Sequence, residues 1–216
     1  FRSGGHSTHP HTSWNLGTNV GDVVQAVEHN RERLSEVTGA HCIFLNQVHG
    51  IEVVRADWHT AQGLQADAVV SAQPLVACTI MVADCLPVLL VRKDARCVGA
   101  AHAGWRGLAA GVLESVVETM VSDAPSVHAS ELTAWMGPCI GPTAFEVGDE
   151  VRQAFVQDDA HAHIYFVASG NKWLANLQGL ARYRLVRAGL APEAIFGNDG
   201  GAQWCTVGNE ALYFSH

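Results

Sequence analysis

Short apolar segments bounded by turn residues recur through the first two thirds of the chain. They are three to eight residues long and rich in Val and Ile, which is typical of buried strands. The segments cover residues 42–45, 51–55, 68–70, 76–83, 88–91, 98–101 and 132–135. This pattern predicts a sheet built mainly from the middle of the sequence.

Longer stretches show the four-residue spacing of amphipathic helices. One covers residues 108–120, directly after the glycines of GWRG, and a second covers 147–155, after the breakers of GPCIGP. A third covers 174–185 and ends near Gly189 and Pro192, and a fourth covers 22–37 and ends at Gly39. Strands in the middle with helices around them predict an α+β domain with a large mixed sheet. Since no repeat or linker divides the chain, we expect one domain over residues 1–216.

The composition of the chain excludes some classes of binding partner. The 216 residues are 48% hydrophobic and 16% charged, as expected of a folded globular chain, and the formal net charge is −8. Because nucleic acids and anionic membranes require clustered Lys and Arg, and no basic run occurs, neither is expected as a partner. The longest apolar stretch, 75–91, is interrupted by Asp84, Cys85 and Pro87, so no membrane span is predicted.

Six cysteines occur without any CxxC pair, and no signal-peptide pattern opens the sequence. These features favour a reducing compartment, so we expect a cytoplasmic protein whose thiols are free to act as ligands. Cys42, Cys78 and Cys97 lie inside apolar segments and are expected in the core.

Three apolar segments stop at a residue that can bind a metal. IFLNQVHG ends at His49, TIMVADCLPVLL breaks at Cys85, and VGAAHAGWRG ends a strand at His102. A catalytic zinc keeps three protein ligands from imidazole and thiolate groups and leaves one position open. The three residues therefore predict a zinc site, although each also fits a satisfied histidine or a buried thiol. A structural zinc would need a fourth ligand, for which Asp84 and Cys139 are candidates.

The segment AHAGWRG that carries His102 has further chemistry. Gly104 and Gly107 allow a sharp turn from strand to helix. Backbone amides at a helix start and the guanidinium of Arg106 are suited to an anion, although a solvated arginine is the alternative. The histidines of the first segment, His6, His9 and His11, lie among Gly, Ser, Thr and Pro and predict an exposed loop with adventitious metal binding.

Motifs along almost the whole chain resemble those of the laccase-domain proteins, also called the YfiH or polyphenol oxidase family. The matching stretches are RSGGHS, SWNLG, VGD, NQVHG, ADAVVS, ADCLPVLL, AAHAGWRGLAAGVLE, MGPCIGPTAFEVGDEV, and a late CT followed by YFS. The resemblance implies a YfiH-like four-layer α/β/β/α sandwich. It also implies that His49, Cys85 and His102 are the metal ligands, the same three residues that the strand ends select.

Members of that family are described as purine nucleoside phosphorylases with adenosine deaminase activity. The resemblance thus implies a zinc enzyme that cleaves adenosine or inosine with phosphate, in which His49, Cys85 and His102 act through the bound metal. The substrate contacts would be Arg106, Gly104, Gln47 and Asn15. Small-molecule nucleoside and phosphate are the expected partners, and the oligomeric state stays open.

Two other functions compete with this interpretation. A copper-dependent, laccase-like polyphenol oxidase fits one family name, but a multicopper site requires many histidines, and only two stand at the candidate site. A hydrolase with Cys85 as nucleophile and His49 or His102 as base uses the same residues, and some family members are described as peptidoglycan editing factors.

Overall fold

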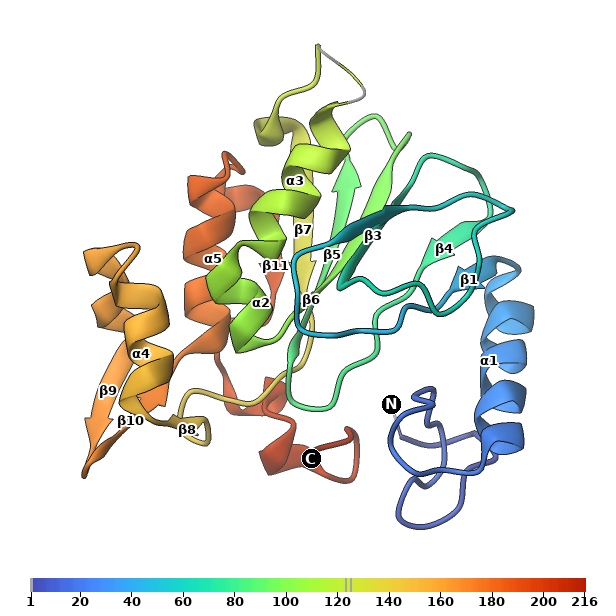
Figure 1. Ribbon diagram of the computed structural model, residues 1–216, viewed down its shortest axis with the longest axis horizontal. Coiled ribbons are helices and arrows are strands. Elements are labelled where there is room, and N and C mark those ends of the chain that lie inside the picture. Colours follow the sequence, from blue (N-terminus) through green and yellow to red (C-terminus); the bar gives the residue numbers. More distant parts are fainter. Residues whose placement is uncertain (1, 123, 125) are drawn as a thin grey trace.

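A six-stranded mixed sheet occupies the middle of the molecule in the computed structural model, which describes residues 2–122, 124 and 126–216 (Figure 1). The order is β11-β7-β5-β6-β3-β2, with β2–β3 and β7–β11 parallel and the other neighbours antiparallel. The strands are β2 (Val53–Arg55), β3 (Ala68–Ser71), β5 (Leu86–Arg92), β6 (Val98–Ala103), β7 (Leu132–Met136) and β11 (Ile195–Gly197). The central strands β5 and β6 are the longest, and the candidate ligands Cys85 and His102 lie at their ends.

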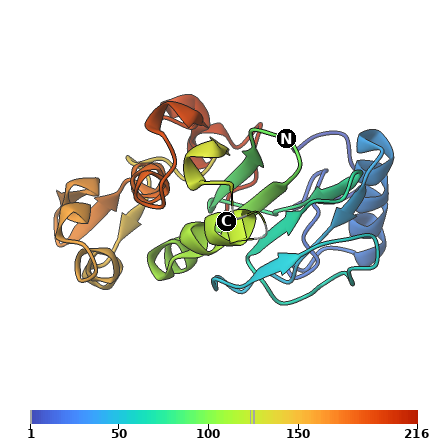
Figure 2. The same ribbon diagram turned by 90° about the horizontal axis from the view of Figure 1, so that it is seen from above.

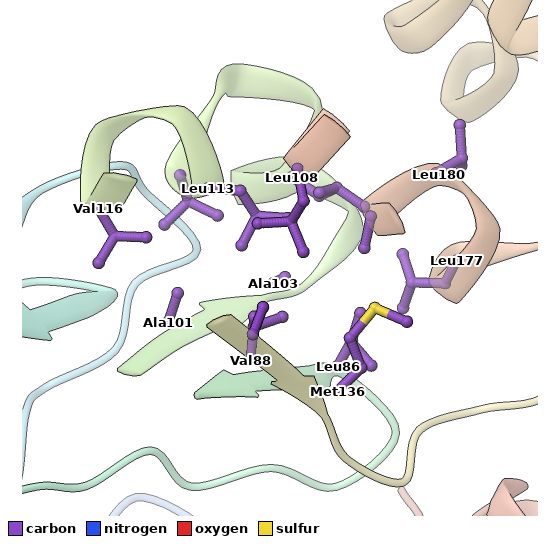
Figure 3. Close-up of a cluster of buried hydrophobic side chains, with 14 of the residues drawn as sticks. Leu86, Val88, Ala101, Ala103, Leu108, Leu113, Val116, Met136, Leu177 and Leu180 are labelled. Carbon is purple, nitrogen blue, oxygen red and sulfur yellow. The ribbon is translucent and has the colours of Figure 1, made fainter. Parts of the chain in front are cut away.

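Three helices cover one face of this sheet: α2 (Trp105–Ala110), α3 (Val112–Ser122) and α5 (Leu177–Arg187). Leu108, Leu113 and Leu180 from these helices meet side chains of the sheet in the main hydrophobic core, shown in Figure 3. Successive side chains of a strand point to opposite faces of the sheet, so Val70 belongs to this core, whereas Val69 packs on the other side.

A second, smaller sheet covers the part of the opposite face that β3 and β6 form. Its parallel strands are β1 (His41–Ile43) and β4 (Val76–Cys78), and helix α1 (Val24–Thr38) lies beyond it (Figure 2). Ile43 and Val76 pack with Val69 and Ala100 of the large sheet in a second core. The layers therefore run α/β/β/α, and the expected α+β fold with a large mixed sheet is confirmed.

A third sheet lies beside the large one, and two of its strands stand where helices were predicted to begin. Its antiparallel strands are β8 (Glu146–Val147), β10 (Lys172–Ala175) and β9 (Phe166–Ser169), next to helix α4 (Asp149–Val156). Val147 lies in β8 and pairs with Trp173 of β10, and Leu174 is the next residue of β10. Neither Val147 nor Leu174 therefore begins a helix as predicted. The helices begin afterwards because Gly148 and Asn176 interrupt the chain as N-caps.

Other predicted elements are shorter than expected or divided. The predicted helix over 108–120 is two helices, because Gly111 adopts a left-handed conformation with φ of 108° between α2 and α3. The predicted strand over 76–83 ends at Cys78, and the one over 51–55 begins at Val53. Strands β8, β9, β10 and β11 were not predicted, because each is only two to four residues long.

On the face of β5, β7 and β11 that points away from the three helices, hydrophobic side chains are partly exposed. Leu89, Trp135 and Phe196 are 43%, 39% and 55% exposed, and each alternates with a buried neighbour on its strand. The described part of the chain contains no helix with the length and apolar character needed to cross a bilayer.

Candidate metal centre

Three separate segments bring His49, Cys85 and His102 together. His49 lies in the turn between β1 and β2, Cys85 directly precedes β5, and His102 lies on β6, opposite Pro87 of β5. One ligand atom from each residue lies within 4.8 Å of the other two. The central strands of the sheet therefore place two of the candidate ligands, and a loop that crosses their ends supplies the third.

The spacing of Cys85 and His49 matches that of two ligands in a tetrahedral zinc site. Cys85 Sγ lies 3.8 Å from His49 Nε2, and the two imidazole rings are 4.7 Å apart at 69°. Zinc bonds of about 2.0–2.3 Å in tetrahedral geometry place ligand atoms roughly 3.4–3.8 Å from one another. His49 is exposed, Cys85 is half-buried and His102 is buried, so the group is open to solvent on the His49 side.

Gly104 leaves the space that the two outer ligands occupy. A Cβ on this residue would stand 2.8 Å from His49 Cδ2 and 2.9 Å from Cys85 Sγ, closer than side chains approach. Its φ of −64° is accessible to any residue, so the close approach, and not the turn, requires glycine here. The close approach of His49 and Cys85 therefore requires a glycine at position 104.

Asp67, at the residue before β3, is a functional candidate that the sequence reasoning did not select. It is fully buried, and His102 Nδ1 lies 2.7 Å from its Oδ1. The backbone N–H groups of Val48, His49 and Gly50 also donate to this carboxylate, at 3.0, 2.9 and 2.7 Å. An acidic residue immediately before the apolar run AVVS was the available signal, because a buried carboxylate needs several donors.

The titration properties of the group follow from these contacts. Burial lowers the pKa of His49, and the positive charges of His102 and Arg106 lower it further. Burial also disfavours the charged form of His102, but the hydrogen bond to Asp67 and the contact with Cys85 outweigh it and raise the pKa to about 9. The pKa of Asp67 lies below its usual value, because the hydrogen bonds from His102 and the three amides outweigh its burial.

Asp84 holds the segment that carries Cys85. Its φ is 79°, which is unusual for a residue with a side chain, and its carbonyl oxygen accepts from Ile140 N–H. Thr206 Oγ1 donates to Asp84 Oδ1 at 2.5 Å, and Ser215 Oγ and His216 N–H donate to Oδ2. Both carboxylate oxygens therefore bind the C-terminal segment.

Cys139 is the other fourth-ligand candidate. It is fully buried, its Sγ accepts from Asn198 Nδ2 at 3.4 Å, and burial raises its pKa to about 12. Within residues 2–122, 124 and 126–216, the group of potential metal ligands contains His49, Cys85 and His102, without Asp84 or Cys139.

The predicted substrate residues occupy different surroundings. Arg106 is exposed, its guanidinium lies 4.4 Å from the Trp105 ring, and its charge acts on His49. The side-chain amide of Gln47 is hydrogen-bonded in both directions to the backbone of Met81, so it links the His49 loop to the loop before Cys85.

Asn15 lies in the N-terminal segment, where its side chain bonds the backbone of Gly17 and Asp22 Oδ2. His6 and His9 are exposed and His11 is half-buried, and the His6 ring packs against His29 at 3.8 Å. In the part of the chain described, these histidines do not join a group of three metal ligands.

The predicted core cysteines divide into two groups. Cys42 and Cys97 are buried as expected. Cys78 is only half-buried, although burial still raises its pKa to about 12. It ends β4, and its thiol donates to the carbonyl oxygen of Val98 at 3.7 Å.

Comparison with known proteins matches the whole chain, residues 1–216, to the family described as multi-copper polyphenol oxidoreductase laccase. A purine nucleoside phosphorylase of Pseudomonas aeruginosa is 49% identical over all of this chain and 84% of its own length. Purine nucleoside phosphorylase YfiH of Escherichia coli is 43% identical over all of this chain and 85% of its own length.

Solved structures agree with these sequence relationships. A Neisseria meningitidis protein superposes with a TM-score of 0.91 at 41% identity, over 99% of this chain and 84% of its own. YlmD of Geobacillus stearothermophilus superposes with a TM-score of 0.89 at 28% identity, over all of this chain and 83% of its own. The fold and the sequence therefore match the same group of proteins.

Proposed function

Since this chain belongs to the family described as multi-copper polyphenol oxidoreductase laccases, we propose that it is a zinc-dependent purine nucleoside phosphorylase acting on adenosine and inosine. The observation that carries the proposal is the group of His49, Cys85 and His102, with ligand atoms within 4.8 Å and one side open. The names of the relatives from Pseudomonas and Escherichia support the reaction type. We include deamination of adenosine as a second activity of the same centre.

Phosphorolysis breaks the bond between ribose C1′ and the purine nitrogen and joins a phosphate oxygen to C1′, while the base leaves with a proton. A bound zinc ion would supply Lewis acidity beside the substrate. The guanidinium of Arg106, whose charge acts on His49, offers a planar pair of donors for the phosphate. Val48 and Ile51, which are 47% and 38% exposed beside His49, offer apolar surface for the purine.

The number of histidines supports zinc over the copper of the family's name. A multicopper oxidase holds a trinuclear cluster and a blue-copper centre, which together need many imidazoles. In the described ranges, with their gaps at 123 and 125, the candidate group contains two histidines and one cysteine. Stoichiometric copper with visible absorption in purified protein would reverse this choice.

The direct test is release of hypoxanthine from inosine by metal-loaded protein, with and without phosphate. We expect phosphate-dependent release that a chelator abolishes and zinc restores. Arg106→Ala should raise the KM for phosphate, whereas Arg96→Ala, at another exposed arginine, should leave it unchanged. Ammonia release from adenosine without phosphate tests the deaminase activity. Absence of phosphate-dependent cleavage in zinc-loaded protein would remove the proposal.

A thiol hydrolase is the second candidate, and one arrangement favours it. Cys85 contacts His102, whose ring is held by Asp67, as a nucleophile, base and orienting carboxylate would be. Iodoacetamide labelling of Cys85 distinguishes the two functions. Protection that disappears on chelation supports the metal centre. Labelling that is independent of metal, with hydrolysis of cell-wall muropeptides lost in Cys85→Ser, supports the hydrolase.

A further inference from the structure

Asp67 contacts two of the three candidate ligands. Its Oδ1 lies 2.7 Å from His102 Nδ1 and also accepts the N–H of His49. Its Oδ2 accepts the N–H groups of Val48 and Gly50, on either side of His49. The backbone carbonyl of Asp67 accepts the N–H of His102 at 2.7 Å, so this residue is tied to both histidines through side chain and main chain.

We propose that Asp67 is the positioning residue of this centre: it fixes both imidazoles in the arrangement that binds a metal before the metal arrives. The proposal rests on the metal-dependent function proposed above, but it concerns the protein's own hydrogen bonds. Asp67 is not itself a ligand: its two oxygens already accept from His102 and three backbone amides, and its atoms do not belong to the ligand group.

For His102, the hydrogen bond decides which nitrogen is available. An aspartate in this position is an acceptor, so the ring must present Nδ1–H to it. Nε2 is then the nitrogen left for a cation. Metal-binding histidines commonly donate their second N–H to a carboxylate, which fixes both the ring orientation and the site of the proton.

For His49, the carboxylate holds the backbone. His49 has a φ of 62°, a left-handed conformation that residues with a Cβ rarely adopt. Three successive amides, from Val48 to Gly50, point at the Asp67 carboxylate and stabilise this turn by charge-assisted hydrogen bonds. The turn brings the His49 ring within 3.8 Å of Cys85 Sγ.

Asp67→Asn preserves the shape of the side chain but replaces one of its two acceptor oxygens with an NH₂ group, which donates hydrogen bonds. If the asparagine oxygen faces His102, its NH₂ group opposes the N–H groups of Val48 and Gly50. If the amide turns round, the NH₂ group opposes His102 Nδ1–H and favours the tautomer that carries its proton on Nε2. Either orientation disturbs one of the two histidines.

The test compares wild type, Asp67→Asn and Ser71→Ala for zinc affinity, by competition with a chromogenic chelator. Ser71 is a buried polar residue at the end of β3, the strand that Asp67 precedes, and its hydroxyl donates to the carbonyl oxygen of Ala56, away from the ligands, so it controls for lost stability. We expect Asp67→Asn to bind zinc about 10–100-fold more weakly and Ser71→Ala to bind it as wild type does. A folded Asp67→Asn protein with wild-type zinc affinity would overturn the proposal.

A second measurement does not depend on the variant's folding. Long-range ¹H–¹⁵N spectra of metal-free wild type should show a hydrogen-bonded proton on His102 Nδ1, and its absence would overturn the proposal. If wild type binds no zinc but shows this proton, the metal-dependent function fails while the contact between Asp67 and His102 stands. If wild type binds zinc and lacks the proton, the positioning role alone fails.

Discussion

Gly104→Ala tests whether the space beside His49 and Cys85 is required for metal binding. The added Cβ would stand 2.8 Å from His49 Cδ2 and 2.9 Å from Cys85 Sγ, whereas ordinary contacts begin at 3.4 Å. Both ligands must therefore move by about half an ångström. Metal sites tolerate deviations of only about 0.2 Å in their bond lengths, so the displacement exceeds what the centre can absorb.

The expected loss is at least tenfold in zinc affinity, or about 1.4 kcal/mol. Two effects on the stability of the metal-free protein oppose each other. Overpacking costs about 1–3 kcal/mol, while replacing glycine in a conformation that alanine accepts stabilises by about 0.4–1 kcal/mol through the unfolded chain. We expect a net loss of about 0.5–2 kcal/mol.

Chelator competition measures the zinc affinity, and urea unfolding with and without zinc measures the stability. Gly50→Ala is the matched control, since its Cβ would lie 3.6 Å from Asp67 Oδ2, an ordinary contact, in the same loop as His49. Zinc should stabilise wild type and Gly50→Ala far more than Gly104→Ala. Equal zinc affinity in all three proteins would show that the metal does not bind at these residues.

Three further predictions follow from individual residues. His102→Ala should abolish turnover but keep cooperative urea unfolding; global unfolding of this variant would indicate a structural zinc instead. Gly111→Ala should destabilise by about 1–2 kcal/mol in urea, because φ of 108° disfavours a Cβ, and an unchanged midpoint would contradict this. Asp159 accepts from Tyr183 and Arg187, which lower its pKa from 3.8, so it stabilises the fold above that pH and the contribution disappears as the carboxylate is protonated. Asp159→Asn should therefore lower stability at pH 7, and its effect in urea titrations should disappear at a pH low enough to protonate Asp159 in the folded protein.

The hydrophobic pattern predicts the elements of the two main layers. The strands from β1 to β7 were indicated by short apolar segments rich in Val and Ile, and the helix face of α3 was indicated by apolar residues at four-residue steps. The strands of the third sheet were missed because Val147 and Leu174 have the same spacing as a helix over a few residues. Only their pairing with Trp173 and Val167 distinguishes the two structures.

The ligands themselves were indicated by residue type at strand ends. Imidazole and thiolate groups at the ends of apolar runs indicated His49, Cys85 and His102, and the resemblance to the laccase-domain family favoured metal binding over a satisfied histidine or a buried thiol. The residues that hold the ligands in place could not be found in this way, because they are distant in sequence from the residues that they contact. Asp67 contacts residues 17 to 35 positions away, and Asp84 contacts Thr206 from the far end of the chain.

The sequence by itself therefore determined the α+β class, the main core and the three candidate ligands, because each depends on residue type and short-range periodicity. The tertiary structure decided the third sheet, the break at Gly111, the need for glycine at position 104 and the role of Asp67. These features depend on which distant segments meet, and that is set by packing of the layers and by the hydrogen bonds that a buried carboxylate must make.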